Sequence, residues 1–118
     1  MASRWYTVVI DANDVASLAR FWAAVLDYQI IYEADDEVVV AKDERTYPGL
    51  VFVPVPEGKA VKNRLHIDLN PDDRDAEVER LVALGATRVD VGQGPDVTWV
   101  VLADPEGNEF CVLRAREQ

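Results

Sequence analysis

The sequence predicts an α+β fold built from two βαβββ modules, and three observations lead to this prediction. Segments rich in β-branched residues alternate with two amphipathic helical segments. The order strand, helix, strand, strand, strand occurs twice along the 118 residues. The predicted helices start at Asp14 and Asp72 and end at Leu26 and Leu84, so the same offset of about half the chain separates both pairs. We therefore predict an internal duplication in which each half supplies one helix and about four strands.

The first module is predicted over residues 4–55 and opens with a strand at 6–10. Asn13 and Asp14 then offer helix N-caps, and apolar residues recur at helical spacing as far as Leu26. Three short β-branched segments complete this module, at residues 29–32, 38–41 and 50–55.

The second module is predicted over residues 63–114 and follows a connector at 56–62, where proline, glycine and charged residues cluster. Its helix begins at the caps Asp72 and Asp73 and ends before Gly85, which is a C-terminal signal. Its strands are predicted at residues 64–70, 86–91, 97–103 and 108–114, with a tight turn at 104–108.

The strand predicted at residues 64–70 decides which way the candidate functional side chains point. Its apolar and polar residues alternate, and side chains on a strand alternate between two faces. We expect Arg64, His66 and Asp68 to face a cleft, formed where two half-sheets lie side by side with their helices outside. A register slip of one residue would reverse this assignment. The residues expected to pack under the second helix are Leu65, Ile67 and Leu69.

Composition excludes several classes of protein. Lys and Arg number 12 against 22 Asp and Glu, a net charge of -10 that disfavours nucleic acid and anionic membranes as partners. The charge suits a cationic ligand, and it suits plain solubility equally well. The single cysteine, Cys111, cannot form an internal disulfide, and the single histidine, His66, excludes zinc sites that need two. No membrane span or secretory signal is apparent, so we expect a cytoplasmic protein.

Five segments carry a resemblance to a known superfamily. They read DVASLARFW and LDY at residues 14–22 and 26–28, LHIDL at 65–69, LGAT at 84–87 and DPEGNEF at 104–110. They resemble the vicinal oxygen chelate superfamily, most strongly its glyoxalase-like domains, and the Phe21-Trp22 pair is similar to bleomycin-resistance proteins. The resemblance implies the glyoxalase / bleomycin resistance / dihydroxybiphenyl dioxygenase fold, a homodimer and a small molecule as the partner.

The resemblance also identifies the positions where a metal would be bound. Metal-dependent members of the superfamily carry His, Gln or Glu ligands on the first, fourth, fifth and eighth strands. In this sequence the four positions fall on Thr7 or Val8, on Phe52 or Val53, on His66 and on Cys111. One imidazole and one thiol do not suit a hard divalent ion, so we expect no metal cofactor. A metal-dependent lyase or dioxygenase is therefore the least favoured alternative.

Each candidate residue has a functional and a structural interpretation. His66 is either a general base or ligand-binding group, or a strand histidine bonded to Asp68. Cys111 is either a nucleophile or a small buried side chain. Trp99 could stack a planar ligand. The candidate ligand-binding residues are Thr7, Phe52, Arg64, His66, Trp99 and Cys111.

Two functions stay open at this point. The first is metal-independent binding of a small cationic or aromatic molecule in the cleft. The alternative is a metal-free lyase or isomerase in which His66 is the general base and Asp68 assists it. The sequence does not decide whether the protein is an enzyme or which ligand it takes. It also does not decide whether the modules pair within one chain or between chains.

Overall fold

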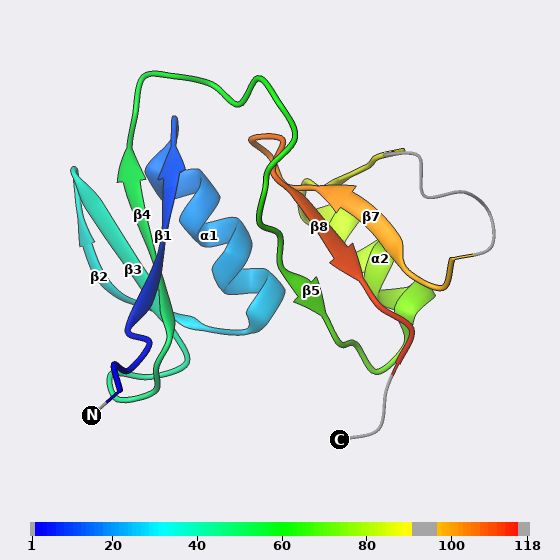
Figure 1. Cartoon of the computed structure of the whole chain (residues 1–118), viewed down its shortest axis with the longest axis horizontal. Helices are drawn as coiled ribbons and strands as arrows, with labels where there is room; N and C mark the ends of the chain where they lie inside the picture. The colour runs from blue at the N-terminus through cyan, green and yellow to red at the C-terminus, as the bar shows by residue number, and fades with distance from the viewer. Residues whose placement is uncertain (1, 91–96, 116–118) are drawn as a thin grey trace. The chain divides into compact units, whose positions relative to one another are not determined.

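The structure is a computed structural model that describes residues 2–90 and 97–115 (Figure 1). The chain divides into two compact units, Met1–Gly58 and Lys59–Gln118, which we call unit 1 and unit 2. The boundary between them falls inside the segment 56–62 that the sequence marks as a connector.

Unit 1 is a four-stranded sheet covered on one face by a helix. The strand order is β1-β4-β3-β2, in which β1 runs parallel to β4 and the other neighbours are antiparallel. The helix α1 packs across β3 and β4. The elements are β1 (Thr7–Ala12), α1 (Val15–Leu26), β2 (Gln29–Ala34), β3 (Glu37–Ala41) and β4 (Gly49–Pro54).

The helix α1 forms where the sequence predicts it, because its cap and its apolar stripe agree. The Asp14 carboxylate accepts a hydrogen bond from the Ser17 amide at 3.1 Å, as an N-cap does. The helix ends at Asp27, whose left-handed backbone (φ 55°) closes the last turn. The buried side chains that join α1 to the sheet include Leu18, Trp22, Val38, Val40 and Phe52.

Unit 2 repeats this architecture with shorter strands. The strand order is β5-β8-β7-β6, in which β5 runs parallel to β8 and the other neighbours are antiparallel. Since strand order and strand directions are the same in both units, the prediction of an α+β fold with two βαβββ modules is confirmed. The elements are β5 (Asp68–Leu69), α2 (Arg74–Leu84), β6 (Thr87–Arg88), β7 (Val100–Ala103) and β8 (Glu109–Val112).

The first strand of unit 2 is much shorter than the sequence predicts. Of the stretch 64–70, only Asp68 and Leu69 form β5. Leu65 is 86% exposed, so the expectation that it packs under the helix is wrong, whereas Leu69 is buried. The physical reason is that, among the described residues, β5 is an edge strand that pairs with β8 alone, and β8 is itself four residues long. The ladder ends before it reaches Leu65, and alternation beyond its end does not bury a side chain.

Smaller differences concern the ends of elements. Asp73, and not Asp72, caps α2, because its carboxylate accepts a hydrogen bond from the Ala76 amide at 3.2 Å. The strand expected at 97–103 starts only at Val100. The strand expected at 86–91 is reduced to β6, and its predicted last residue, Val91, lies outside the described residues. Within the described ranges, neither helix has the length and apolar character that a membrane crossing requires.

Candidate functional site

The candidate polar residues of unit 2 lie on the sheet face away from α2. In Figure 1, α2 lies behind β7 and β8. Along β5, Leu69 is buried and Asp68 is exposed, so Asp68 is on the face that α2 does not cover. Asp68 is the register partner of Cys111 in β8, and Cys111 is the partner of Val101 in β7. These residues form a row across three strands.

The carboxylate of Asp68 is the centre of a cluster of three ionisable groups. Nε2 of His66 lies 3.0 Å from Oδ1 of Asp68, and the two side chains are 43% and 49% exposed. The Cys111 thiol also donates a hydrogen bond to Asp68. One imidazole nitrogen, one carboxylate oxygen and the sulfur all lie within 4.8 Å of one another. We call His66, Asp68 and Cys111 the Asp68 cluster.

The environment of Cys111 keeps its thiol protonated. Burial raises the pKa of the Cys111 thiol, and the negative charge and hydrogen bond of Asp68 raise it further, against a smaller opposing effect of Lys62. The thiolate is the nucleophilic form of cysteine. A buried thiol with a raised pKa is a poor nucleophile, so the geometry favours the interpretation of Cys111 as a small buried side chain that donates to Asp68.

The hydrogen bond of His66 decides which of its nitrogens is available. When Nε2 carries the proton shared with Asp68, Nδ1 of a neutral imidazole is an acceptor. Such a histidine can take a proton from a ligand or accept a hydrogen bond from it. The geometry therefore permits both functions left open by the sequence.

The other two candidates of unit 2 are Arg64 and Trp99. Arg64 is exposed and precedes His66 by two residues. Trp99 is 39% exposed and directly precedes β7. Continuing the alternation of β7 back by one residue puts Trp99 on the same side as Val101, which is the register partner of Cys111.

The two candidates of unit 1, Phe52 and Thr7, are less accessible than the exposed candidates of unit 2. Phe52 has 0% exposed surface, because it shares with Val38 the sheet face that α1 covers. The expectation that Phe52 lines a ligand site is therefore wrong, and Phe52 is a core residue. Thr7 is half-buried, and its hydroxyl donates to the Gly49 carbonyl at 3.1 Å.

The residues present do not fit the hard divalent ion of the metal-dependent relatives. The Thr7 hydroxyl is bonded to a backbone carbonyl, and the fourth-strand position offers Phe52 or Val53, neither of which can ligate. The eighth-strand position holds the protonated Cys111 thiol. A hard ion needs several oxygen ligands, which this set does not supply.

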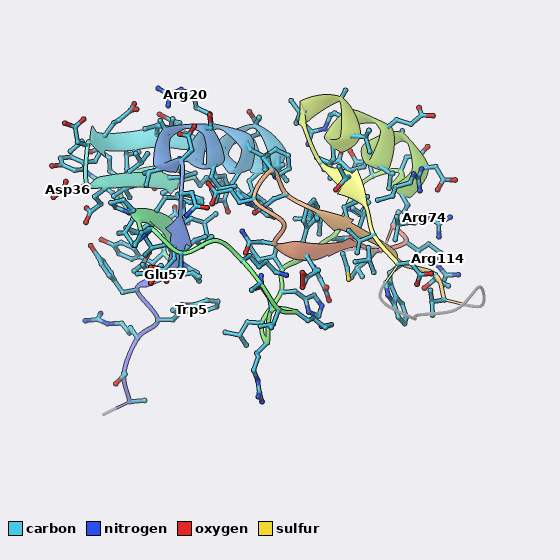
Figure 2. All side chains as sticks on the ribbon, turned by 90° about the horizontal axis from the view of Figure 1, so that it is seen from above. Trp5, Arg20, Asp36, Glu57, Arg74 and Arg114 are labelled. Carbon is cyan, nitrogen blue, oxygen red and sulfur yellow. The ribbon has the colours of Figure 1, made fainter. Side chains whose placement is uncertain are left out.

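Register, which sequence patterns do not provide, identifies an apolar row on the sheet face of unit 1 away from α1. Val9 pairs with Val51, Val51 with Val39, and Val39 with Tyr32, so the row crosses all four strands. Val9 and Tyr32 at its ends are 57% and 54% exposed. Figure 2 shows Trp5 at the opposite side of unit 1 from Arg20 of α1. Each segment alone is a run of strand residues, so only the pairing reveals the row.

A second arrangement that the sequence did not predict is a set of polar contacts between residues 59–63, which precede the Asp68 cluster in the chain, and the start of β8. Glu109 at the start of β8 pairs with Lys59 and accepts a hydrogen bond from the Asn63 amide at 2.9 Å. The Asn63 side chain donates to Asn108 at 3.0 Å. The carboxylate of the buried Asp104 accepts hydrogen bonds from the backbone amides of Glu106 and Asn108 and from the Asn108 side chain. The sequence DPEGN predicts the turn, but the long-range bonds to residues 59–63 carry no sequence signal.

Two βαβββ units, each with one helix-covered and one helix-free sheet face, define the class of glyoxalase and bleomycin-resistance folds. A model of the glyoxalase-like domain family matches residues 7–113. The chain belongs to this family and, with it, to the vicinal oxygen chelate superfamily. A comparison with curated proteins gave no match.

Solved structures show the same fold at low sequence identity. A glyoxalase/bleomycin resistance protein/dioxygenase family enzyme from Burkholderia phytofirmans PsJN is 21% identical over 90% of this chain and 94% of its own, with a TM-score of 0.68. The fosfomycin resistance protein FosX from Mesorhizobium loti is 18% identical over 98% and 94%, with a TM-score of 0.71. A bleomycin-binding protein from Streptomyces verticillus, complexed with copper(II)-bleomycin, is 19% identical over 99% of both chains, with a TM-score of 0.62.

Proposed function

We propose that this glyoxalase-like protein binds a small organic cation with an aromatic part at the Asp68 cluster, without a metal ion. The observation that carries the proposal is the Asp68 carboxylate, which is half exposed and already oriented by His66 at 3.0 Å and by the Cys111 thiol. An oriented, accessible carboxylate is a partner for a cationic group.

The surroundings of the cluster support the two parts of the ligand. The net charge of -10 attracts cations over long range. Trp99 is 39% exposed and lies on the same side of β7 as Val101, the register partner of Cys111, so its ring is available for stacking. A bleomycin-binding protein complexed with copper(II)-bleomycin shares the fold.

Tryptophan fluorescence tests the proposal directly. The full chain is titrated in chelator-containing buffer with metal-free bleomycin, with a planar aromatic cation, and with a neutral aromatic compound of the same size. We expect a saturable change for the cations, a much weaker one for the neutral compound, and loss of the signal in Trp99→Phe. No saturable change with any cationic probe would contradict the proposal.

Two variants test whether the Asp68 carboxylate binds the cation. Asp68→Asn removes the charge and keeps the size, so it is expected to weaken binding of the cation about ten-fold or more. Asp36→Asn is the matched control, because Asp36 lies in the exposed β2–β3 turn of unit 1 and removes the same unit of charge. Equal weakening in both variants would mean that only the overall charge matters.

A second candidate function rests on the hydrogen bond of His66. With Nε2 bonded to Asp68, Nδ1 can act as a general base, as a metal-free lyase or isomerase of this family would require. Exchange of solvent deuterium next to the carbonyl of α-hydroxycarbonyl compounds would reveal such proton transfer. We expect His66→Ala to abolish the exchange with unchanged folding. An active His66→Ala variant would remove this candidate.

The proposal includes a homodimer in the cytoplasm. The family resemblance implies the homodimer, and a single cysteine fits a protein that needs no disulfide. Sedimentation equilibrium of the full chain measures the state, with twice the 13.2 kDa chain mass expected. A mass equal to one chain would contradict the dimer and leave the binding proposal unaffected.

A further inference from the structure

Segment 59–67 of unit 2 leads into β5, and its first attachment to the sheet is the carboxylate of Glu109 in β8. The Lys59 ammonium pairs with one oxygen of this carboxylate, and the Asn63 amide donates a hydrogen bond to the other at 2.9 Å. The two side chains of the ion pair are only 20% and 10% exposed. Because a shielded ion pair is screened less than an exposed one, this attachment holds more firmly than a surface pair does. We call Lys59, Asn63 and Glu109 the Glu109 clamp.

The second attachment of the segment is a backbone hydrogen bond beside the Asp68 cluster. The Ile67 carbonyl accepts it from the Cys111 amide at 3.0 Å, directly before β5. Four residue steps separate Ile67 from Asn63, whereas only two steps of β8 separate the residues that they contact. Since paired strands advance equally per residue, the longer segment cannot pair evenly with β8 and has to bend.

His66 lies next to this bend, between the two attachments. The bend falls at Arg64 and Leu65, and all three residues are exposed. Within the described part of the chain, none of the three makes a backbone–backbone hydrogen bond. A stretch without ladder bonds or buried side chains opens locally at a low cost in free energy. The attachments at its two ends are therefore what confines it.

We infer that Glu109 is a positioning residue for His66. Through the Glu109 clamp it confines segment 59–67, so that Nε2 of the imidazole stays 3.0 Å from the Asp68 carboxylate. The consequence for ligand binding rests on the proposed function, whereas the consequence for the position of His66 does not.

The turn before β8 supports the clamp from the other side. The Asn63 side chain donates to Asn108 at 3.0 Å, and the Asn108 side chain donates to the carboxylate of Asp104 at 2.9 Å. Asp104 itself is buried. The clamp therefore attaches segment 59–67 to a turn that is held by a buried carboxylate.

The clamp affects binding through position and through charge, and Lys59 distinguishes the two effects. If the imidazole contacts Asp68 only part of the time, the apparent affinity for a ligand falls in proportion to that fraction. By charge alone, removing the negative Glu109 disfavours a bound cation, whereas removing the positive Lys59 favours it. Positioning predicts weaker binding of the cation in both cases.

NMR spectroscopy of the full chain tests the position of His66 without any ligand. His66 is the single histidine, so its ring protons are an unambiguous probe. In wild type we expect NOEs from this ring to the β-protons of Asp68 and Cys111. Glu109→Gln and Lys59→Met are expected to weaken these NOEs about two-fold or more, because the contact is populated less. Unchanged NOEs in both folded variants would overturn the inference.

A matched control separates positioning from a general loss of stability. Glu77→Gln also breaks an ion pair of unit 2, in which Glu77 contacts Arg80 at 2.7 Å on α2, and it should leave the NOEs of His66 unchanged. Equal weakening in this control would show that lowered stability, and not the clamp, moves the ring. Circular dichroism checks that each variant is folded. If Glu109→Gln does not fold, Asn63→Ala replaces it, because it removes only the side-chain bond to Asn108.

A final titration with the planar aromatic cation separates this inference from the proposed function. We expect the Kd to rise about two-fold or more in both Glu109→Gln and Lys59→Met. Unchanged or tighter binding in Lys59→Met would disprove the consequence for the ligand and leave charge as the only effect of the clamp. Weakened NOEs in a protein that takes no organic cation would disprove the proposed function and leave Glu109 established as a positioning residue.

Discussion

Asp68 and Cys111 are register partners in the parallel pairing of β5 with β8, and the Cys111 thiol donates a hydrogen bond to the Asp68 carboxylate. The two residues are 43 positions apart in the sequence. Their pairing adds a third group to the contact between His66 and Asp68, and the resulting Asp68 cluster underlies the proposed ligand site.

The first prediction concerns the reactivity of Cys111. Because burial and the Asp68 charge raise the pKa of the thiol, little thiolate is present at mildly alkaline pH, and alkylation by iodoacetamide should be slow. Asp68→Asn removes the charge and should speed alkylation several-fold while leaving burial in place. The rate is measured by mass spectrometry. In denaturant, wild type and variant should react equally fast, and equal rates in the folded state would contradict the role of Asp68.

The second prediction concerns acid stability. Burial by itself would raise the pKa of Glu109, but the hydrogen bonds from Lys59 and the Asn63 amide outweigh it and lower the pKa below its ordinary 4.5. A lowered carboxyl pKa gives stability that is fully present above 4.5 and is lost as the pH falls through the folded-state pKa.

Glu109→Gln tests this linkage. The variant should be less stable than wild type by about 1–2 kcal/mol at neutral pH, because a charge-assisted bond is lost. The difference should shrink in acid, where wild-type Glu109 is protonated. Urea unfolding at neutral and acid pH measures it, with the exposed Glu44→Gln as the control. A difference independent of pH would show that the charge of Glu109 is not responsible.

The third prediction concerns the turn before β8. Asp104 is 3% exposed, and its carboxylate accepts hydrogen bonds from the amides of Glu106 and Asn108. Asp104→Ala leaves these amides without their acceptor and should lower the free energy of unfolding by about 3 kcal/mol. Asp104→Asn keeps one oxygen and should lose less, whereas Asp36→Ala in an exposed turn should be near neutral. Denaturant unfolding gives all three values, and similar losses for Ala and Asn would refute the explanation.

The fourth prediction compares the two helix ends. Asp27 after α1 and Gly85 after α2 both have positive φ, at 55° and 122°. A side chain is strained in this region, so Asp27→Gly should stabilise the protein by about 0.5–1 kcal/mol, and Gly85→Ala should destabilise it by about 1 kcal/mol or more. The added Cβ at Gly85 would meet Pro105 at an ordinary 3.5 Å, so backbone strain and not a clash is the cause. Thermal unfolding that shifts in the same direction for both variants would contradict this.

Local signals in the sequence were sufficient for the architecture. The caps Asp14 and Asp73, the apolar stripes of both helices and the repeat of the strand order each act within a few residues, so the pattern of one chain predicts them. The contact between His66 and Asp68 is of the same kind, because residues two apart on extended backbone share a side. The sequence by itself therefore determined the two βαβββ modules and offered the imidazole–carboxylate pair as one of the interpretations of His66.

Only the tertiary structure decided which groups join that pair. The pairing of β5 with β8 brings Cys111 to Asp68, and the alternation of β4 beneath α1 removes Phe52 from any ligand surface. The shortness of edge strand β5 leaves Leu65 exposed. Each of these outcomes depends on register and on ladder length, which arise from pairing between residues distant in sequence, and the pattern of one strand contains no information about its partner.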